Sequence, residues 1–326
     1  MEKHLVSPNP HIHAKVSTSS LMGDVLIALA PASIVAVLFY GWAELTVLLL
    51  SMAFCVLIEW AITKFLLKKP GHFCGSAAMV TGLLLGLNLP SSTSWWIVLV
   101  GAIVAIGIAK MSFGGLGQNI FNPAITARVF LLVSFPVQMT NWVPTKGFIP
   151  VVDAISGATP LSIVKEALKS GQGLPEIFGS HNWSTLLVWD LGASAGEASA
   201  LALLAGFVYL LVRKVIKPWI PLSIFVTIAV IASIFHLIDP AQFTDAHFNI
   251  LTGGVILGAC FMATDYVTSP MSDWGGVIYG VGIGLILMMI RYFGSYPEGM
   301  SFAILIMNCF VPLINRAFHQ KKYGRA

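Results

Sequence analysis

The sequence predicts an all-α integral membrane protein. Hydrophobic residues make up 57% of its 326 residues and charged residues only 10%, whereas a soluble domain carries about 25% charged residues. The apolar residues fall in blocks of about 17 to 25, the length that a helix needs to cross a hydrocarbon core of roughly 30 Å. The sequence has no alternating pattern of the kind that a membrane barrel needs, with segments of about ten residues. We therefore expect a bundle of transmembrane helices.

Ten apolar segments can be drawn, and we expect each to form one transmembrane helix. They lie at 21–40, 44–67, 73–89, 94–110, 119–136, 192–213, 219–238, 247–263, 275–293 and 299–317. The third, fifth and eighth are short and contain helix-breaking residues such as Pro90, Pro123 and Gly254. We expect these helices to break or kink, and irregular backbone at such depth must line a cavity or lie buried in protein.

Basic residues indicate the orientation of the bundle. Cytoplasmic loops are enriched in Lys and Arg, and an N-terminus on the cytoplasmic side places thirteen basic residues inside and four outside. The thirteen are Lys3, Lys15, Lys64, Lys68, Lys69, Lys110, Arg213, Lys214, Lys217, Arg316, Lys321, Lys322 and Arg325, and the four are Lys146, Lys165, Lys169 and Arg291. The pI of about 8.9 reflects this anchoring charge. It gives no reason to expect a nucleic-acid partner.

These assignments divide the chain into five parts. We expect a cytoplasmic tail at 1–20, a first five-helix unit at 21–136, an outer loop at 137–191, a second five-helix unit at 192–317 and a second cytoplasmic tail at 318–326. Loops longer than about 15 residues usually have a function. We therefore look for the chemistry of the protein first in the outer loop.

The two units show weak internal similarity. An offset of 172 matches the Gly-x-x-x-Gly at 82–86 with the one at 254–258, and a nearby offset matches Asp24 with Glu197. Because each unit has an odd number of helices, the second must enter the membrane from the opposite side. This predicts an inverted repeat, as in many transporters, whose sites lie at the repeat interface. The alternative is that Gly and Leu recur by chance in an apolar chain.

The outer loop contains the most specific motif, which runs from Asp153 through Ser156, Gly157 and Ala158 to Thr159. Thr159 precedes a proline and is predicted to cap a short amphipathic helix. Its small neighbours leave the hydroxyl accessible, and a phosphate attached there would be favoured by the helix N-terminus. On local geometry alone, an ordinary capped loop helix explains the same residues.

The motif Asp-x-x-Ser-Gly-Ala-Thr resembles the flavinylation motif, in which a flavin transferase takes FMN from FAD and links it to threonine through a phosphoester. The resemblance implies covalent FMN on Thr159, with the rest of the motif read by the transferase. Segments at 114–124, 196–201, 261–270 and 290–299 extend the similarity over nearly the whole chain. They resemble the family that contains the RnfD component of the Rnf electron-transport complex and the NqrB component of the sodium-pumping NADH:quinone reductase. RnfD is the closer match, because NqrB usually has a longer N-terminal extension.

The resemblance implies a multi-pass subunit in the cytoplasmic (inner) membrane, working with Rnf subunits A, B, C, E and G. Such a complex passes electrons between ferredoxin and NAD and couples this to Na⁺ or H⁺ translocation. We expect this subunit to relay electrons through FMN, to hold no catalytic residue of its own and to be inactive alone. The rival hypothesis is a channel or secondary transporter on a similar inverted repeat, with Asp24 and Glu197 binding a small solute.

Ionisable residues within apolar segments are costly and by default functional. Asp24, Glu197 and Asp265 are therefore candidates for an ion path, whereas Glu59 and Asp190 lie near segment ends, where we expect them to meet interfacial water.

Four polar residues are further cofactor-binding candidates, namely Asn119, Asn122, Thr264 and Asp265. The two asparagines either bind a flavin ring or satisfy backbone groups freed by Pro123. Whether a second, noncovalent flavin such as riboflavin lies in the bundle stays open. The four cysteines never occur as Cys-x-x-Cys, so we expect no iron–sulfur cluster held by this chain alone and no metal site.

Overall fold

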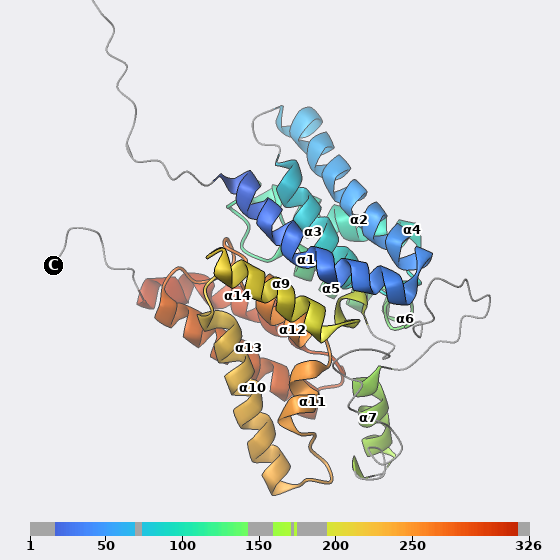
Figure 1. Cartoon of the computed structure of the whole chain (residues 1–326). Coiled ribbons are helices and arrows are strands. Elements are labelled where there is room, and N and C mark those ends of the chain that lie inside the picture. Colours follow the sequence, from blue (N-terminus) through green and yellow to red (C-terminus); the bar gives the residue numbers. More distant parts are fainter. Residues whose placement is uncertain (1–16, 69–73, 143–158, 171–172, 175–193, 319–326) are drawn as a thin grey trace, which may run out of the picture.

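A computed structural model describes residues 17–68, 74–142, 159–170, 173–174 and 194–318. All regular elements in these ranges are helical, which confirms the predicted fold class (Figure 1). Six helices are long and apolar enough to cross a membrane, and three shorter apolar helices accompany them.

The described residues of the first unit, with those that follow it up to Met139, form six α-helices and three short π- or 3₁₀-helical stretches. In chain order these are α1 (Thr18–Tyr40), α2 (Trp42–Ala61), η1 (Ile62–Leu67), α3 (Gly75–Leu87), α4 (Trp95–Ala102), η3 (Ile103–Ile108), η4 (Met111–Phe113), α5 (Pro123–Ser134) and α6 (Pro136–Met139). The outer loop contributes α7 (Pro160–Lys169). The second unit contains η6 (Ala195–Glu197), α9 (Ala200–Val212), α10 (Trp219–Ile238), α11 (Ala246–Leu251), α12 (Val255–Leu257), η7 (Gly258–Met262), α13 (Asp273–Phe293) and α14 (Met300–Ala317).

Side-chain caps define where several helices begin. Ser17 accepts a hydrogen bond from the Ser20 N–H at the start of α1, and Ser272 accepts one from the Gly275 N–H at the start of α13. At the start of α5, Asn122 accepts from two backbone N–H groups, and Pro123 occupies the first helical turn. A proline there costs nothing, because its missing N–H would have no partner in the helix.

The three segments expected to be irregular are short or broken. Helices α3 and α5 have only 13 and 12 residues. The eighth segment is interrupted between α11 and α12, where Gly253 and Gly254 have φ angles of 73° and 66°. This left-handed conformation favours glycine. The sixth segment differs from the expected 192–213, because its helix α9 begins only after the Ser199 cap.

Helix contacts in the two units match one another. The contacts α2–α3, α2–α4, α1–α3, α4–α5 and α3–α5 have counterparts in α10–α11, α10–α13, α9–α12, α13–α14 and η7–α14. Across the units, α1 packs on α9 and α5 packs on α14. Helices α1 and α5 of the first unit therefore each pack on their equivalent in the second unit, as expected for two units related by a two-fold axis.

Both cross-unit pairs run antiparallel. Asp24 near the start of α1 contacts Arg213 at the end of α9, and a Cβ at Gly206 of α9 would lie 2.0 Å from the Ala28 carbonyl oxygen. In the other pair, Arg128 within α5 contacts Glu298, just before α14. The Asn122 N–H lies 3.0 Å from the side-chain amide of Asn308, in the middle of α14. Antiparallel equivalents are what an inverted repeat requires.

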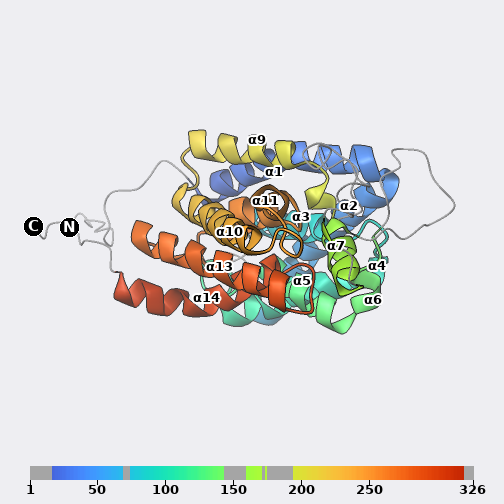
Figure 2. The ribbon, with the colours of Figure 1, turned by 90° about the horizontal axis from the view of Figure 1, so that it is seen from below.

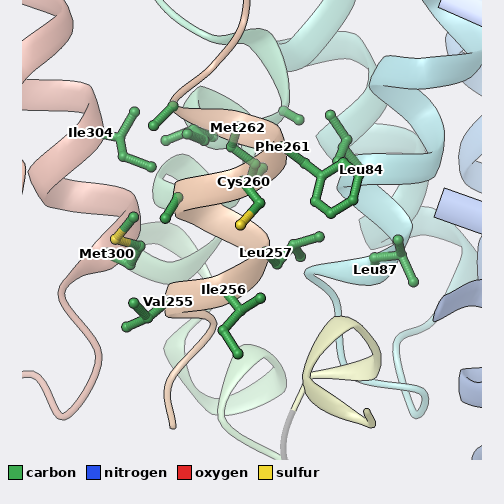
Figure 3. Packing of buried hydrophobic residues seen from close by; sticks show 14 of the residues in the cluster. Leu84, Leu87, Val255, Ile256, Leu257, Cys260, Phe261, Met262, Met300 and Ile304 are labelled. Carbon is green, nitrogen blue, oxygen red and sulfur yellow. The ribbon is translucent and has the colours of Figure 1, made fainter. Parts of the chain in front are cut away.

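The broken segment is at the centre of the core. Figure 3 shows Cys260, Phe261 and Met262 of η7 packed between Met300 and Ile304 of α14 and Leu84 of α3. The outside of the bundle is apolar as well. Along α10 the exposed apolar side chains include Leu222, Val226, Val230, Ile234 and Leu237, which form one stripe at helical spacing. This stripe is suited to contact with lipid.

The bundle has two distinct ends. Figures 1 and 2 both place the start of α1 and the end of α14 at one end and α7 at the other. The expected tails, 1–20 and 318–326, lie mostly outside the described residues, as does most of the outer loop at 137–191.

Candidate functional site

Thr159 caps the N-terminus of α7, as the sequence predicts. Its hydroxyl oxygen accepts a hydrogen bond from the Ser162 N–H at 3.2 Å, and the hydroxyl donates to Ser162 Oγ at 3.0 Å. Pro160 is the first residue of the helix. The other motif residues, Asp153, Ser156, Gly157 and Ala158, lie outside the described residues.

Helix α7 is docked on the bundle through one apolar face and one lysine. Leu161, Val164 and Leu174 form a small cluster with Phe248, which lies in α11. On the same helix, Lys165 Nζ donates to the carbonyl oxygen of Tyr296 at 2.7 Å. These contacts hold the capped end of α7 against the second unit.

The expected accessibility of the Thr159 hydroxyl is wrong. The residue is only 3% exposed, because the docking of α7 turns its first residues towards the bundle. The docking of α7 depends on partners more than 80 positions away, such as Phe248. The sequence around Thr159 carries no sign of it.

A cavity opens beside Thr159. Its lining includes Thr159 and Ser162 from α7, Arg128 from α5, and the aromatic side chains of Trp142 and Tyr296. Its volume is about 310 Å³, at the lower end of the range of about 300–1,000 Å³ that small-molecule sites occupy.

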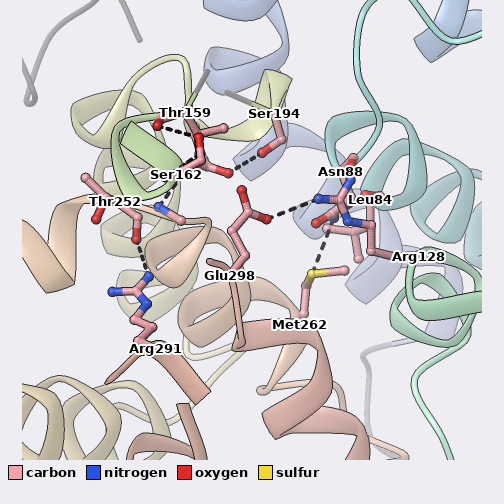
Figure 4. A network of polar contacts seen from close by, with 12 residues as sticks. Leu84, Asn88, Arg128, Thr159, Ser162, Ser194, Thr252, Met262, Arg291 and Glu298 are labelled. Atoms are coloured by element: carbon pink, nitrogen blue, oxygen red, sulfur yellow. Dashed lines mark hydrogen bonds and ion pairs between the residues drawn. The ribbon is translucent and has the colours of Figure 1, made fainter. Parts of the chain in front are cut away.

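Arg128 is the central charge of this cavity (Figure 4). Its guanidinium lies 5.4 Å from the ring centre of Trp142 and forms an ion pair with Glu298 at 3.2 Å. It also donates to the carbonyl oxygen of Asn88, at the end of α3. Because Arg128 is 3% exposed, a positive charge is held in a largely dry environment next to Thr159.

Glu197 lies in an adjoining cavity that shares Arg128 and Glu298 with the first. Its carboxylate accepts from Ser194 Oγ at 2.6 Å and from the Gly253 N–H at 3.0 Å. The second contact is with the break between α11 and α12. Glu197 therefore satisfies a backbone donor that the interrupted helix leaves free.

A separate cavity at the opposite end of the bundle brings together four predicted residues. Asn119, Asn122, Thr264 and Asp265 all line it, together with Lys110. Its volume is about 70 Å³. Residues from both units thus form one site, although more than 140 positions separate Asn122 from Thr264.

The local contacts of these residues are largely structural. Asn122 caps α5 and donates from Nδ2 to the Met262 carbonyl oxygen at 3.0 Å. Of its two expected roles, it therefore fulfils the one of satisfying backbone groups. Asn119 Nδ2 and the Thr264 hydroxyl likewise donate to carbonyl oxygens, those of Phe121 and Cys260.

Asp265 is the carboxylate of this inner cavity. One of its oxygens accepts from the Thr268 hydroxyl at 3.1 Å. No ion pair of Asp265 is found in the described part of the chain.

The expectation that Glu59 meets interfacial water is wrong. Glu59 is 1% exposed and pairs with Lys110 at 2.6 Å. The pair joins α2 to the turn after η3, and Lys110 borders the inner cavity. An ion pair in this position offsets the cost of burying both charges. The charge count treats Lys110 as an exposed cytoplasmic cation, and it is buried instead. Asp190 lies outside the described residues.

Asp24 is bound by α9. Its carboxylate accepts from the Tyr209 hydroxyl at 3.0 Å and pairs with Arg213 at 3.3 Å. Asp24 and Glu197 thus occupy opposite ends of the antiparallel α1–α9 pair. They do not form one site, although the repeat relates them.

Several residues of these sites do not stand out from the sequence as candidates, among them Arg128, Trp142, Tyr296, Glu298 and Lys110. Arg128 carries a usable signal, since it interrupts an apolar segment just as the acidic candidates do. Glu44 in α2 carries the same signal. It is fully buried, and neither carboxylate oxygen has a hydrogen-bond partner among the described residues; nothing in this structure accounts for it.

Comparison with known proteins identifies the chain's relatives. Residues 5–324 match the model of the NQR2, RnfD, RnfE family. The chain is 43% identical to the D component of the Na(+)-translocating ferredoxin:NAD(+) oxidoreductase complex of Acetobacterium woodii, over 98% of this chain and 95% of that protein. It is 38% identical to the D component of the ion-translocating oxidoreductase complex of Halorhodospira halophila, over 97% of this chain and 94% of that protein. The chain therefore belongs to the NQR2, RnfD, RnfE family.

Proposed function

We propose that this protein is the D-type membrane component of an ion-translocating ferredoxin:NAD oxidoreductase, the Rnf complex, and that it carries FMN on Thr159. The observation that carries the cofactor proposal is the position of Thr159, a capping hydroxyl at the rim of a cavity with a buried cation and two aromatic rings. The names of its nearly full-length relatives support the proposed complex.

The residues around Thr159 fit a phosphoester-linked flavin. A phosphate on its Oγ1 would lie at the N-terminus of α7, where the free N–H groups favour negative charge by about 0.3–1 kcal/mol. Trp142 and Tyr296 offer aromatic faces, and Arg128 offers a fixed positive charge. Bound FMN would supply one- and two-electron transfer, while these side chains would set its position and electronics.

We expect the subunit to act only within its complex. The described residues contain no nicotinamide or ferredoxin site that we can identify. Electrons would therefore reach and leave the flavin through partner subunits, for which subunits A, B, C, E and G are the candidates. Maturation would need a flavin transferase, which joins Thr159 Oγ1 to the FMN phosphorus of FAD and releases AMP and the hydroxyl proton.

We propose the inner cavity as the site of any second, noncovalent flavin such as riboflavin, and its volume of about 70 Å³ would have to increase to admit the ring system. Asn119, Asn122, Thr264 and Asp265 line it from both units, and such junctions between repeats are where membrane proteins place their ligands. Free hydrogen-bonding capacity is limited there, because the amide groups of both asparagines already bind backbone carbonyls.

The position of Thr159 predicts how substitutions affect flavin attachment. Thr159→Asn keeps a side-chain cap but has no hydroxyl, so it should contain no covalent flavin, whereas Thr159→Ser should retain some. Peptide mass spectrometry and denaturing-gel fluorescence after co-expression with a transferase would measure this. Thr140→Ala, in the same cavity, should keep full loading. Covalent flavin in Thr159→Asn would refute the assignment, and unmodified wild-type protein beside a loaded control would favour the transporter hypothesis.

Burial of the Thr159 hydroxyl predicts the order of maturation. A transferase cannot reach it while α7 is docked, so attachment should precede docking or require α7 to leave the bundle. Leu161→Ala weakens the docking cluster by about 2–5 kcal/mol, so purified flavin-free protein should accept FMN about tenfold faster or more. Glu166→Ala, on the exposed face of α7, is the control. Equal rates for Leu161→Ala, Glu166→Ala and wild type would contradict this order.

The charge asymmetry predicts a cytoplasmic location for both termini and an outer position for α7, in the cytoplasmic (inner) membrane. A single cysteine at Ser170 in a cysteine-free variant should react with a membrane-impermeant thiol reagent added to intact cells. A cysteine at Lys217, at the other end of the bundle, should react only after the membrane is opened. Reversed accessibility would overturn the orientation.

The carboxylates Asp24, Glu197 and Asp265 are our candidates for an Na⁺ or H⁺ path. Glu197 has the strongest support, because it lies between the two units and next to the helix break. In the reconstituted complex, Glu197→Gln should slow ion uptake at least about tenfold, as expected for loss of a charged hydrogen-bonding group. Flavin content should not change. Uptake at the wild-type rate would remove Glu197 from the path; Glu166→Gln is the matched exposed control.

A further inference from the structure

A fourth cavity lies on the other side of α7, away from Thr159. Lys165 and Lys169 of α7 line it together with Arg291 near the end of α13. It is the roomiest of the cavities described, with about 1600 Å³ of empty space including its open part. Neither Thr159 nor Arg128 borders it, so it is separate from the proposed flavin site.

The cations of this cavity are an unusual set. The charge count places four basic residues on the outer side, where Lys and Arg are disfavoured, and it leaves out Arg128, which lies in an apolar segment and borders the cavity beside Thr159. One of them, Lys146, lies outside the described residues. The other three all line this one cavity. Such clustering of the few outer cations indicates a requirement for positive charge at this position.

No carboxylate among the described residues pairs with these three cations. Lys165 donates only to carbonyl oxygens, and burial, followed by the neighbouring charge of Lys169, lowers the pKa of Lys165. Arg291 is 6% exposed and binds the carbonyl oxygens of Asn249 and Thr252, but its Nε has no hydrogen-bond partner among the described residues. Among the described residues these three cations thus lack an ion pair, and Arg291 feels carboxylates, those of Glu298 and Glu197, at longer range.

Part of the remaining wall of the cavity is apolar and leads to the lipid-facing surface, whereas Gln242, Thr244 and Asn249 contribute polar groups to it. Phe243 and Phe293 line it, and both rings contact Phe235 of α10, with centroids 5.0 and 6.0 Å away. At the ends of α10 and α13 the apolar side chains are exposed, with 82% for Leu237 and 70% for Phe293. A ligand with a charged end in the cavity could thus continue along an apolar surface.

We propose that this cavity binds the phosphate headgroup of an anionic phospholipid from the outer leaflet, with the acyl chains lying along the ends of α10 and α13. The cluster of cations requires an anion, and its continuity with exposed apolar side chains favours an amphiphile over a free phosphate. Lys165 and Lys169 would contact the headgroup from α7. The site does not depend on the flavin, so the two proposals can fail independently.

The test compares lipid retention by variants in bilayer nanodiscs of mixed phosphatidylglycerol and phosphatidylcholine. Phosphatidylglycerol released from the disc with the protein would be counted by native mass spectrometry. A lysine near an anionic headgroup strengthens binding about fivefold, so Lys165→Gln/Lys169→Gln should lower phosphatidylglycerol retention more than tenfold and leave phosphatidylcholine unchanged. Lys169→Glu alone keeps the contacts of Lys165 with the carbonyl oxygens of Arg291 and Tyr296. It should also lower phosphatidylglycerol retention.

The control is Lys64→Gln/Lys217→Gln, which removes the same charge at the other end of the bundle and should retain the lipid. Inorganic phosphate is added in a parallel measurement, and displacement of the lipid by millimolar phosphate would indicate a free-anion site. That result would overturn the proposal. Equal phosphatidylglycerol retention by wild type, Lys169→Glu and the double variant would overturn it as well.

Discussion

The structure depends on how backbone groups are satisfied where helices end inside the bundle. In a hydrocarbon environment an unpaired N–H or C=O group costs several kcal/mol, and here several helices end at depth. Arg128 supplies a donor to the last turn of α3, and Arg291 supplies donors to the carbonyl oxygens at the end of α11. Asn122 caps α5 and also donates to the end of η7. Charged and amide side chains are therefore needed at the centre of the fold before any functional role is considered.

Because charged side chains satisfy these helix ends, charges also lie next to the proposed sites. Arg128 closes α3, pairs with Glu298 and borders the cavity beside Thr159, so one side chain is both a helix cap and the main electrostatic feature of the proposed flavin site. Removing one partner of a buried pair costs about 3–5 kcal/mol, whereas exposed pairs such as Lys217–Asp273 contribute about 0–1 kcal/mol. A substitution at Arg128 changes the stability of the fold and the environment of the proposed flavin together. At Thr159 the two can be separated, because Thr159→Asn keeps a side-chain cap and removes the hydroxyl.

Sequence patterns predict the helices well because hydropathy, caps and glycines act locally. The irregular third, fifth and eighth segments and the Thr159 cap were accessible in this way. The common location of Asn119, Asn122, Thr264 and Asp265 was not, because it depends on how the two units pack. Burial of Thr159 was not, nor was the Glu59–Lys110 pair, whose members are 51 positions apart. A residue near a segment end looks exposed when only its own segment is considered. The partner that buries it is fixed by the packing of α2 against the turn after η3, which no local pattern encodes.

Two of the three carboxylates proposed for ion movement, Glu197 and Asp265, lie on opposite sides of a neutral layer. Glu197 is on the side of the flavin cavity and Asp265 lines the inner cavity. Between them, Asn88 contacts the Met262 sulfur at 3.5 Å, and Asn122 donates to the Met262 carbonyl oxygen at 3.0 Å. Each side also holds a cation, Arg128 on one and Lys110 on the other. A cation that moved between Glu197 and Asp265 would leave one carboxylate and pass the positive charges of Arg128 and Lys110. Between them it would meet the amide groups of Asn88 and Asn122 and the thioether of Met262. The static arrangement therefore opposes free leakage, and passage would require the ion pairs of Arg128 and Lys110, or the break beside Gly253, to rearrange.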